Sequence, residues 1–241
     1  MGNTTNKDFF KVYKNVFDHK AVDAIWWLIT HKKFEGLEAP IKIGKESNIF
    51  SALTKNNERV AVKIFRVNSS SFFQMHKYLA MDTRFRKVGS NRGTITTWAK
   101  REFLNLKKAY EMGVKVPNPI AVRDNIIVMG FIGDKHPEPP YAAPLLKDSC
   151  DNPEELYKGV IENIRLLYTA KIIHGDLSEF NILNDNGKPV IIDLSHGTPI
   201  SSNAAPEMLE RDVANICRFF NKKGMKLTPQ EVLKEIKRPN N

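Results

Sequence analysis

Three polar side chains between positions 174 and 193 have the types and the spacing that phosphoryl transfer requires. Asp176 stands two residues after His174, Asn181 follows five residues later, and Asp193 ends the apolar segment VIID. The transfer needs a metal held against phosphate oxygens and a group that orients the attacking nucleophile. Asp176 could accept a hydroxyl proton, and the oxygens of Asn181 and Asp193 suit a hard cation. Each residue alone would more often form a turn or a cap, but together they indicate a phosphotransferase site.

A cation for the same chemistry is offered by Lys63 in the apolar segment VAVKIF. A lysine on such a strand can contact the phosphates of a bound nucleotide and pair with a glutamate on a helix. Glu102 is the predicted partner. Two alternatives stay open: Lys63 could point to solvent, and Glu102 could lie on a solvated helix face among Lys100, Arg101 and Lys107.

The predicted phosphate-binding loop departs from both common glycine-rich patterns. The segment KIGKESN holds the single glycine Gly44, so G-x-G-x-x-G is absent. A Walker A loop would need glycine at Ala39 and Ser or Thr at Glu46. The sequence therefore argues against a P-loop NTPase.

Apolar periodicity and turn residues predict the elements of the first half of the chain. They are a helix over 17–34, strands at 41–53 and 59–65 with a turn at Asn56-Asn57, an amphipathic helix over 98–112 ended by Gly113, and a strand at 125–132. Gly133 and the proline-rich stretch 136–144 then indicate a linker.

The second half is predicted to be mostly helical, with one β-hairpin. One helix starts with Asn152 as its cap, and the last helix starts with Thr228 and Glu231 as a capping box. The hairpin turns at Asn186-Gly187, because both central positions of a type I′ turn favour positive φ. This order of elements predicts an α+β protein with two lobes and a cleft at the linker.

Composition places the chain among ordinary globular proteins. Of its 241 residues, 41% are hydrophobic and 27% are charged, and its apolar runs are too short to span a bilayer, so we expect no membrane association. Cys150 and Cys217 have no zinc-binding spacing, which favours a reducing, cytoplasmic location. The net charge of +10 favours anionic partners, with nucleic acid first and ATP second.

The tripeptide Ala205-Pro206-Glu207 matches the end of a protein-kinase activation segment, but only as a coincidence. It follows Asp193 by twelve residues, too few for a full segment. Only 34 residues follow Glu207, too few for the large substrate lobe of a conventional protein kinase.

The chain carries, in order, the segments GKESN, VAVKIF, RFR at 84–86, TWAKREFLNL at 97–106, VMGFIG, APLLKD at 143–148, HGDLSEFNIL and IIDLS. Together they resemble the RIO family of atypical protein kinases, from about residue 17 to 221. The resemblance is to the type-1 branch, because the winged-helix domain of the type-2 branch is not expected in the residues before Gly44.

The resemblance implies a trimmed bilobal kinase fold that uses ATP and Mg²⁺, or Mn²⁺. A small N-terminal β-sheet lobe and a mostly helical C-terminal lobe are expected, without an activation segment or a peptide-binding subdomain. The implied boundaries are an N-terminal helical extension at 1–40, the first lobe at 41–132 with a flexible insertion at about 68–92, and the second lobe at 133–241.

By matched position, the resemblance also implies a role for each site residue. Asp176 is the catalytic aspartate, Asn181 and Asp193 hold the metal, and Lys63 with Glu102 secures the phosphates. The other ATP contacts are expected from the loop and hinge residues Gly44, Lys45, Glu46, Ser47, Asn48, Met129, Gly130 and Ile132.

RIO proteins are serine/threonine autokinases and ATPases that act in small-ribosomal-subunit maturation, so the resemblance implies the pre-mature subunit and its RNA as partners. Ser69, Ser70 and Ser71 are the predicted autophosphorylation region. A basic RNA-binding surface is predicted over 77–108, from Lys77, Arg84, Arg86, Lys87, Arg92, Lys100, Arg101, Lys107 and Lys108. Alternatively, these cations are merely solvated while Trp98 faces the core.

Two other functions stay open. HGDL with glycine is frequent in aminoglycoside- and choline-kinase-like enzymes and in the small kinase of the KEOPS tRNA-modification complex, although Leu194-Ser195 and the insertion at 68–92 argue against these families. A kinase fold without activity could also serve as a nucleotide-binding, RNA-docking module, although its chemical side chains are intact.

Overall fold

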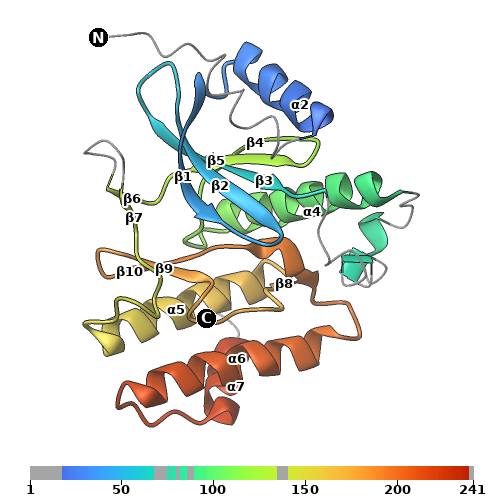
Figure 1. Cartoon of the computed structure of the whole chain (residues 1–241). Coiled ribbons are helices and arrows are strands. Elements are labelled where there is room, and N and C mark those ends of the chain that lie inside the picture. The colour runs from blue at the N-terminus through green and yellow to red at the C-terminus, as the bar shows by residue number, and fades with distance from the viewer. Residues whose placement is uncertain are drawn as a thin grey trace. The chain divides into compact units, whose positions relative to one another are not determined.

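The computed structural model describes residues 18–67, 75, 76, 78, 79, 82–85, 90–134 and 141–238, and Figure 1 shows its elements. The chain divides into two compact units. Unit 1 draws on the ranges 1–76, 87–100 and 120–131, and unit 2 on 77–86, 101–119 and 132–241. The helix α4 (Asn91–Glu111) contributes its first part to unit 1 and its second part to unit 2.

Unit 1 is built on a five-stranded sheet in the order β1-β2-β3-β5-β4. The strands are β1 (Gly36–Ile43), β2 (Ser47–Leu53), β3 (Arg59–Phe65), β4 (Pro119–Arg123) and β5 (Ile126–Gly130). The pairs β1–β2, β2–β3 and β3–β5 are antiparallel. The central strand β3 is buried along its whole length, so any charged residue on it needs a partner inside the protein.

The helix α2 (His19–Thr30) forms the hydrophobic core of unit 1 together with this sheet, and Figure 1 shows it beside β4 and β5. Ala24, Ile25 and Leu28 of α2 pack in one cluster with Phe50 of β2 and Val62 of β3. The helix predicted over 17–34 is therefore present but shorter. It starts at an aspartate N-cap, whose carboxylate accepts the N–H of a first-turn residue at 2.8 Å.

Unit 2 is mostly helical, with short strands and 3₁₀ turns. Its helices are α5 (Pro153–Thr169), α6 (Ala205–Lys222) and α7 (Pro229–Lys237). The strands form the pairs β6 (Gly133–Asp134) with β7 (Tyr141–Ala142), β8 (Ile172–Ile173) with β11 (Thr198–Pro199), and β9 (Ile182–Asp185) with β10 (Lys188–Ile191). The 3₁₀ turns are η1 (Thr83–Phe85) and η2 (Leu194–His196). Within this unit α5 contacts α7 and β10, and α6 contacts α7 (Figure 1).

The predicted hairpin is confirmed. Strands β9 and β10 are joined by Asn186 at φ 52° and Gly187 at φ 83°, the two positive values that a type I′ turn requires. The tripeptide Ala205-Pro206-Glu207 opens α6, where a proline and an acidic residue both suit the first helical turn.

Two sequence predictions about strands and helices are wrong. The single strand predicted at 41–53 divides at Gly44 into β1 and β2, because the chain turns back there. The helix predicted over 98–112 begins seven residues earlier, at Asn91. The predicted linker includes the β6–β7 pair, in which Gly133 has φ 134° and an added Cβ would lie 2.4 Å from the backbone nitrogen of Ala143. Residues 136–140 lie outside the described part of the chain.

The predicted side-chain caps of two helices are also wrong. The side chain of Asn152 accepts no backbone N–H from the first turn of α5, and its amide donates instead to the carboxylate of Glu155 at 2.8 Å. Thr228 makes no such bond to α7 either, because its hydroxyl donates to the Glu231 carboxylate. In both cases the side chain donates to a glutamate three residues on, and no bond from a backbone N–H to its oxygen is present. The predicted boundaries of the lobes stay predictions.

None of the helices in the described part of the chain is long and apolar enough to cross a membrane.

Candidate active site

The segment that carries Asp176 has a backbone fixed from both sides. Gly175 has φ 81°, and a Cβ added there would lie 3.0 Å from the carbonyl oxygen of His196, so glycine is required before the aspartate. The ring of His174 is buried; its Nδ1 accepts the Asp176 N–H at 3.3 Å, and its Nε2 lies 3.1 Å from the carbonyl oxygen of Ile192. This pair of bonds assigns the ring proton to Nε2. The ring thereby connects the segment to the end of the β9–β10 hairpin.

A buried aspartate on α6 also binds the backbone of this segment. The carboxylate of Asp212 accepts the N–H groups of Gly175 at 2.8 Å and Leu177 at 2.9 Å. Arg211 donates to the Gly175 carbonyl, and Asn215 donates to the Leu177 carbonyl at 3.2 Å. Burial raises the pKa of Asp212, although the two N–H groups oppose the shift. Asp212 was not predicted from the sequence, although a carboxylate on the buried face of an amphipathic helix was the signal that could have indicated it.

Asp176 and Asn181 lie within hydrogen-bonding distance of each other. The Nδ2 of Asn181 donates to the Asp176 carbonyl at 2.7 Å and lies 3.4 Å from its carboxylate Oδ2. The Asn181 N–H donates to the carbonyl of Ser178 at 3.0 Å. Since both side-chain bonds use the amide nitrogen, the amide oxygen is the atom that can act as a metal ligand. The carboxylate of Asp176 is exposed and can meet a substrate hydroxyl.

Asp193 follows the hairpin directly and has a left-handed backbone, with φ and ψ both 64°. The hairpin brings it beside Asn181, because the N–H of Ile192 donates to the Asn181 carbonyl at 3.0 Å. The hydroxyl of Ser195 donates to Asp193 Oδ1 at 2.8 Å. A carboxylate and an amide oxygen so placed suit Mg²⁺, which binds one or two carboxylates and completes its shell with phosphate and water. The three residues predicted for the chemistry are therefore brought together in unit 2.

Lys63 and Glu102 are both buried charges. Lys63 stands on β3 of unit 1, paired with Ile49 and Ile127; it is 4% exposed, and its Nζ lies 4.9 Å from the centre of the Phe65 ring. Glu102, in unit 2, is 2% exposed. The two alternatives that placed these residues in solvent are therefore wrong. Their pairing with each other stays a prediction.

The predicted phosphate loop is a tight turn between β1 and β2. The Gly44 N–H donates to the carbonyl of Ser47 at 3.0 Å, and an added Cβ would lie 2.9 Å from the same oxygen. Lys45 is exposed at the tip, whereas Asn48 is 2% exposed. The turn joins the neighbouring antiparallel strands β1 and β2 directly, and Gly44 is the residue at which the turn begins. The ATP contacts of the loop stay predictions.

The predicted hinge residues divide between the units. Met129 and Gly130 are half-buried on β5 of unit 1. Ile132 belongs to unit 2, where its carbonyl accepts the N–H of Ala143 at 3.0 Å. The adenine contacts expected from these residues stay predictions.

Part of the predicted basic surface is wrong. Arg101 is fully buried. Trp98 is 1% exposed, which confirms the alternative in which it faces the core. The side chain of Arg84 donates to Asp82 at 2.7 Å, and that of Arg92 donates to an aspartate before α2. The cations that remain exposed on α4 are Lys100, Lys107 and Lys108. The residues outside the described part of the chain are Ser69, Ser70, Ser71, Lys77, Arg86 and Lys87.

Solved structures confirm the fold. The Rio2 kinase from Chaetomium thermophilum superposes with a TM-score of 0.70 at 27% identity, covering 90% of this chain and 69% of that one. A Rio2 kinase-ADP/Mg²⁺-phosphoaspartate complex from the same organism has a TM-score of 0.67 at 25% identity, covering 97% and 76%. The α+β architecture is therefore that of the trimmed, bilobal kinase fold.

Sequence comparisons agree with the geometry of the site. The model of the RIO domain matches residues 48–233. The RIO-type serine/threonine-protein kinase Rio1 of Haloferax volcanii is 39% identical over 218 residues, covering 90% of this chain and 74% of the relative. That of Methanocaldococcus jannaschii is 34% identical over 229 residues, covering 94% and 77%. Human serine/threonine-protein kinase RIO1 is 33% identical over 236 residues, covering 94% and 41%. The chain therefore belongs to the RIO domain family and is a serine/threonine protein kinase of the RIO1 type.

Proposed function

We propose that this kinase binds ATP with Mg²⁺, phosphorylates serine or threonine hydroxyls including its own, and hydrolyses ATP. The observation that carries the proposal is the grouping of Asp176, Asn181 and Asp193 on one hairpin-anchored segment. The related Rio2 kinase forms a complex with ADP and Mg²⁺. Membership of the RIO family favours this function over the KEOPS-type and small-molecule kinases.

Each residue of the site has a distinct part in this proposal. Asp176 orients the attacking hydroxyl and accepts its proton. The amide oxygen of Asn181 and the carboxylate of Asp193 hold Mg²⁺, or Mn²⁺, which accepts the same oxygen ligands. The bound metal neutralises charge on the phosphates. Lys63 adds a second cation for the phosphate oxygens.

Hydrolysis of ATP can proceed through Asp176 itself. The related Rio2 complex contains a phosphoaspartate, and Asp176 is an exposed carboxylate at the site. A carboxylate oxygen attacks the γ-phosphorus, and the bond to ADP breaks with its electron pair leaving on the ADP oxygen. Water then cleaves the acyl phosphate, which releases inorganic phosphate and restores the carboxylate.

Replacing Asp176 by alanine tests the proposal. We expect phosphoryl transfer and hydrolysis to fall by about 10²-fold or more, because the group that orients and deprotonates the nucleophile is gone. Nucleotide affinity, measured by calorimetry with and without Mg²⁺, should stay close to that of the unmodified chain. Asp185→Ala, on β9 of the same hairpin, is the control and should keep both properties.

Hydroxylamine separates the two kinds of phosphate, because it cleaves an acyl phosphate and leaves serine and threonine phosphates intact. Hydroxylamine-labile phosphate should be present in the unmodified chain and absent in Asp176→Ala. An equal loss of affinity and rate in Asp176→Ala would contradict the assigned role. Nucleotide binding without any transfer or hydrolysis in the unmodified chain would favour the RNA-docking module instead.

We also propose that the protein acts in the cytoplasm in maturation of the small ribosomal subunit, with ribosomal RNA as its partner. The support is the net charge of +10 and the exposed lysines Lys100, Lys107 and Lys108 on α4. Such charges release counterions from RNA phosphates on binding. Autophosphorylation at Ser69–Ser71 is part of the same proposal.

A further inference from the structure

The loop that follows Asp193 is held by a buried arginine. The side chain of Arg101, from α4, is 0% exposed. Its Nη1 donates to the carbonyl of Ser195 at 2.5 Å, and its Nη2 donates to the hydroxyl of Thr198 at 3.2 Å. Its Nε donates to the carboxylate of Asp82 at 3.1 Å, and this aspartate is also 0% exposed. All of these contacts lie within unit 2.

Asp82 is held in turn by a second arginine, which reaches the same loop through an asparagine. Arg84 donates to both carboxylate oxygens of Asp82, at 2.9 and 2.7 Å, and to Oδ1 of Asn105 at 2.9 Å. Asn105 then donates to the carbonyls of Leu194 at 3.1 Å and Gly197 at 2.8 Å. A Cβ at Gly197 would lie 2.6 Å from the Asn105 amide nitrogen, so the contact needs glycine there.

These contacts converge on the residue that carries the metal carboxylate. Asp193 has the left-handed backbone, and its Oδ1 accepts the hydroxyl of Ser195. The carbonyl of the same serine is the acceptor for Arg101. A residue in such a conformation keeps it only when the surrounding structure enforces it. Arg101 and Asn105 therefore restrain the backbone that follows Asp193. The hydroxyl of Ser195 restrains the carboxylate of Asp193.

We propose that Asp82, Arg101 and Asn105 are positioning residues that hold Asp193 in the geometry for Mg²⁺ binding. The segment that carries Asp82 thereby sets the metal affinity of unit 2. The inference deepens the proposed function and rests on it. Groups that orient a metal ligand in this way change metal affinity by about 10- to 100-fold when removed.

The test measures the magnesium gain, defined as the ratio of ADP affinity with Mg²⁺ to that without it. Asp82→Asn removes the partner of Arg101, and Ser195→Ala removes only the hydroxyl bonded to Asp193. We expect the magnesium gain to fall by about 10- to 100-fold in each variant, with the affinity for metal-free ADP unchanged.

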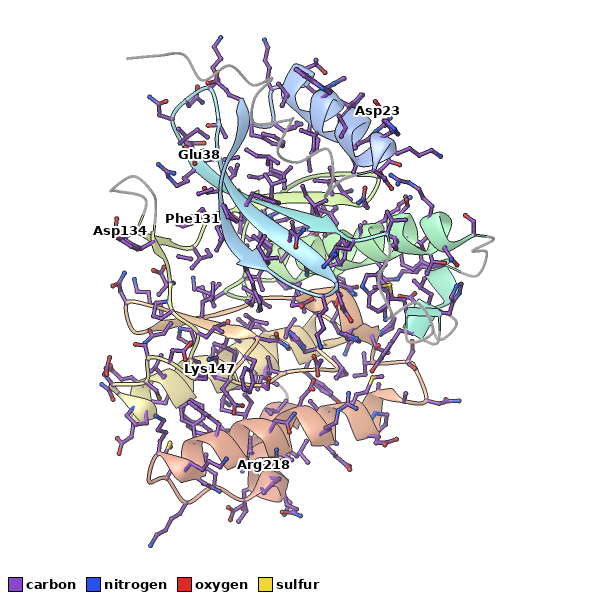
Figure 2. All side chains as sticks on the ribbon, in the orientation of Figure 1. Asp23, Glu38, Phe131, Asp134, Lys147 and Arg218 are labelled. Carbon is purple, nitrogen blue, oxygen red and sulfur yellow. The ribbon has the colours of Figure 1, made fainter. Side chains whose placement is uncertain are left out.

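A matched control is the Glu38–Arg59 pair of unit 1, at 2.7 Å, with Glu38 labelled on β1 in Figure 2. Glu38→Gln also breaks an arginine–carboxylate pair, but it should keep the full magnesium gain. The double variant Asp82→Asn/Arg101→Met separates positioning from stability. Removing both charges should restore much of the thermal stability lost in Asp82→Asn, because the fully buried Arg101 charge is gone and Arg84, which also loses Asp82, is 37% exposed. The magnesium gain should stay low, because the bond to Ser195 is absent.

A magnesium gain that recovers together with thermal stability, or that is unchanged in Ser195→Ala, would overturn the inference. Such a result would leave the network as a stabilising element alone. Failure of the proposed function gives a different result, in which the unmodified chain itself binds no ADP or shows no magnesium gain.

Discussion

At the residue scale, Gly175 and Asp193 show how backbone conformation serves the active site. Gly175 combines φ 81° with a close approach to the His196 carbonyl, so a side chain is excluded. Asp193 takes φ 64° with a side chain, a conformation that costs most residues about 1 to 2 kcal/mol. Asp and Asn tolerate this conformation better than other residues. The less favourable conformation is thus placed on the residue whose carboxylate we propose as the ligand for Mg²⁺.

We expect Asp193→Asn to fold normally and to lose the magnesium dependence of nucleotide binding. Asparagine accepts the left-handed backbone, but its neutral amide is a weaker ligand than a carboxylate for a hard dication. Titrations with ADP over a range of Mg²⁺ concentrations measure the change, and thermal unfolding checks the fold. Asp185→Asn is the control. Equal magnesium dependence in Asp193→Asn and the unmodified chain would place the metal elsewhere.

At the element scale, the two faces of α4 carry different kinds of polar side chain. Its buried side presents Arg101, Glu102 and Asn105, whereas Lys107 and Lys108 are exposed. The buried polar side chains are tolerated because hydrogen bonds offset the loss of solvation. The same helix therefore contributes to the loop that follows Asp193 and to the charged surface.

We expect Asp82→Asn to lower the free energy of unfolding by about 3 to 5 kcal/mol at neutral pH, because it leaves the Arg101 guanidinium buried without this carboxylate. Burial alone would raise the pKa of Asp82, but the bonds and charge of Arg84, joined by Arg101, hold it below its usual value. The stabilisation is therefore present above the unfolded-state pKa of about 3.9, and it is lost as the pH falls through the folded-state value.

Urea unfolding of the unmodified chain and of Asp82→Asn across the acidic range measures this dependence. The difference between the two should be constant at neutral pH and shrink below about pH 4. A difference that grew on acidification would mean that Asp82 is not the ionised partner of Arg101.

At the scale of the whole molecule, Lys63 and Glu102 bring one buried charge to each unit. If they pair, Lys63→Met and Glu102→Gln should each weaken ATP binding, and the double variant should be less impaired than the sum of the two. The expected coupling is about 0.5 to 3 kcal/mol, the range for residues in contact. Additive effects on ATP affinity would contradict the pairing.

The charge of the whole molecule leads to a separate prediction about RNA. Replacing Lys100, Lys107 and Lys108 by alanine should weaken binding to ribosomal RNA and lower the slope of log affinity against log salt by about 2, since each phosphate contact contributes about 0.7 to 0.9. The control changes Lys222, the last residue of α6, and Lys223 and Lys226, which follow it; all three are exposed. Arg84 and Arg92 are poor choices for this test, because each is hydrogen-bonded to an aspartate within the protein, whereas Lys107 meets Glu111 only at 3.8 Å with both side chains more than half exposed. Equal losses in both triple variants would mean that RNA responds only to net charge.

Much of the catalytic segment could be predicted because its parts are close in sequence. The spacing of Asp176 and Asn181, and the turn at Asn186-Gly187, are local patterns whose geometry depends on a few neighbouring residues. Element boundaries were less predictable. The break at Gly44 and the uncapped start at Asn152 depend on which of several possible hydrogen bonds forms.

The sequence by itself determined the family and the kinase class, because the spacing of its motifs can be read without knowledge of the fold, and it predicted which residues carry the chemistry. Only the tertiary structure decided what holds those residues in place. Asp212 meets Gly175 across 37 residues, and Arg101 meets Ser195 across 94. Nothing in the local pattern distinguishes Arg101 from the exposed Lys100 beside it, since both lie in a basic stretch of helix. Burial separates them, and burial depends on contacts with segments that are far away in the sequence.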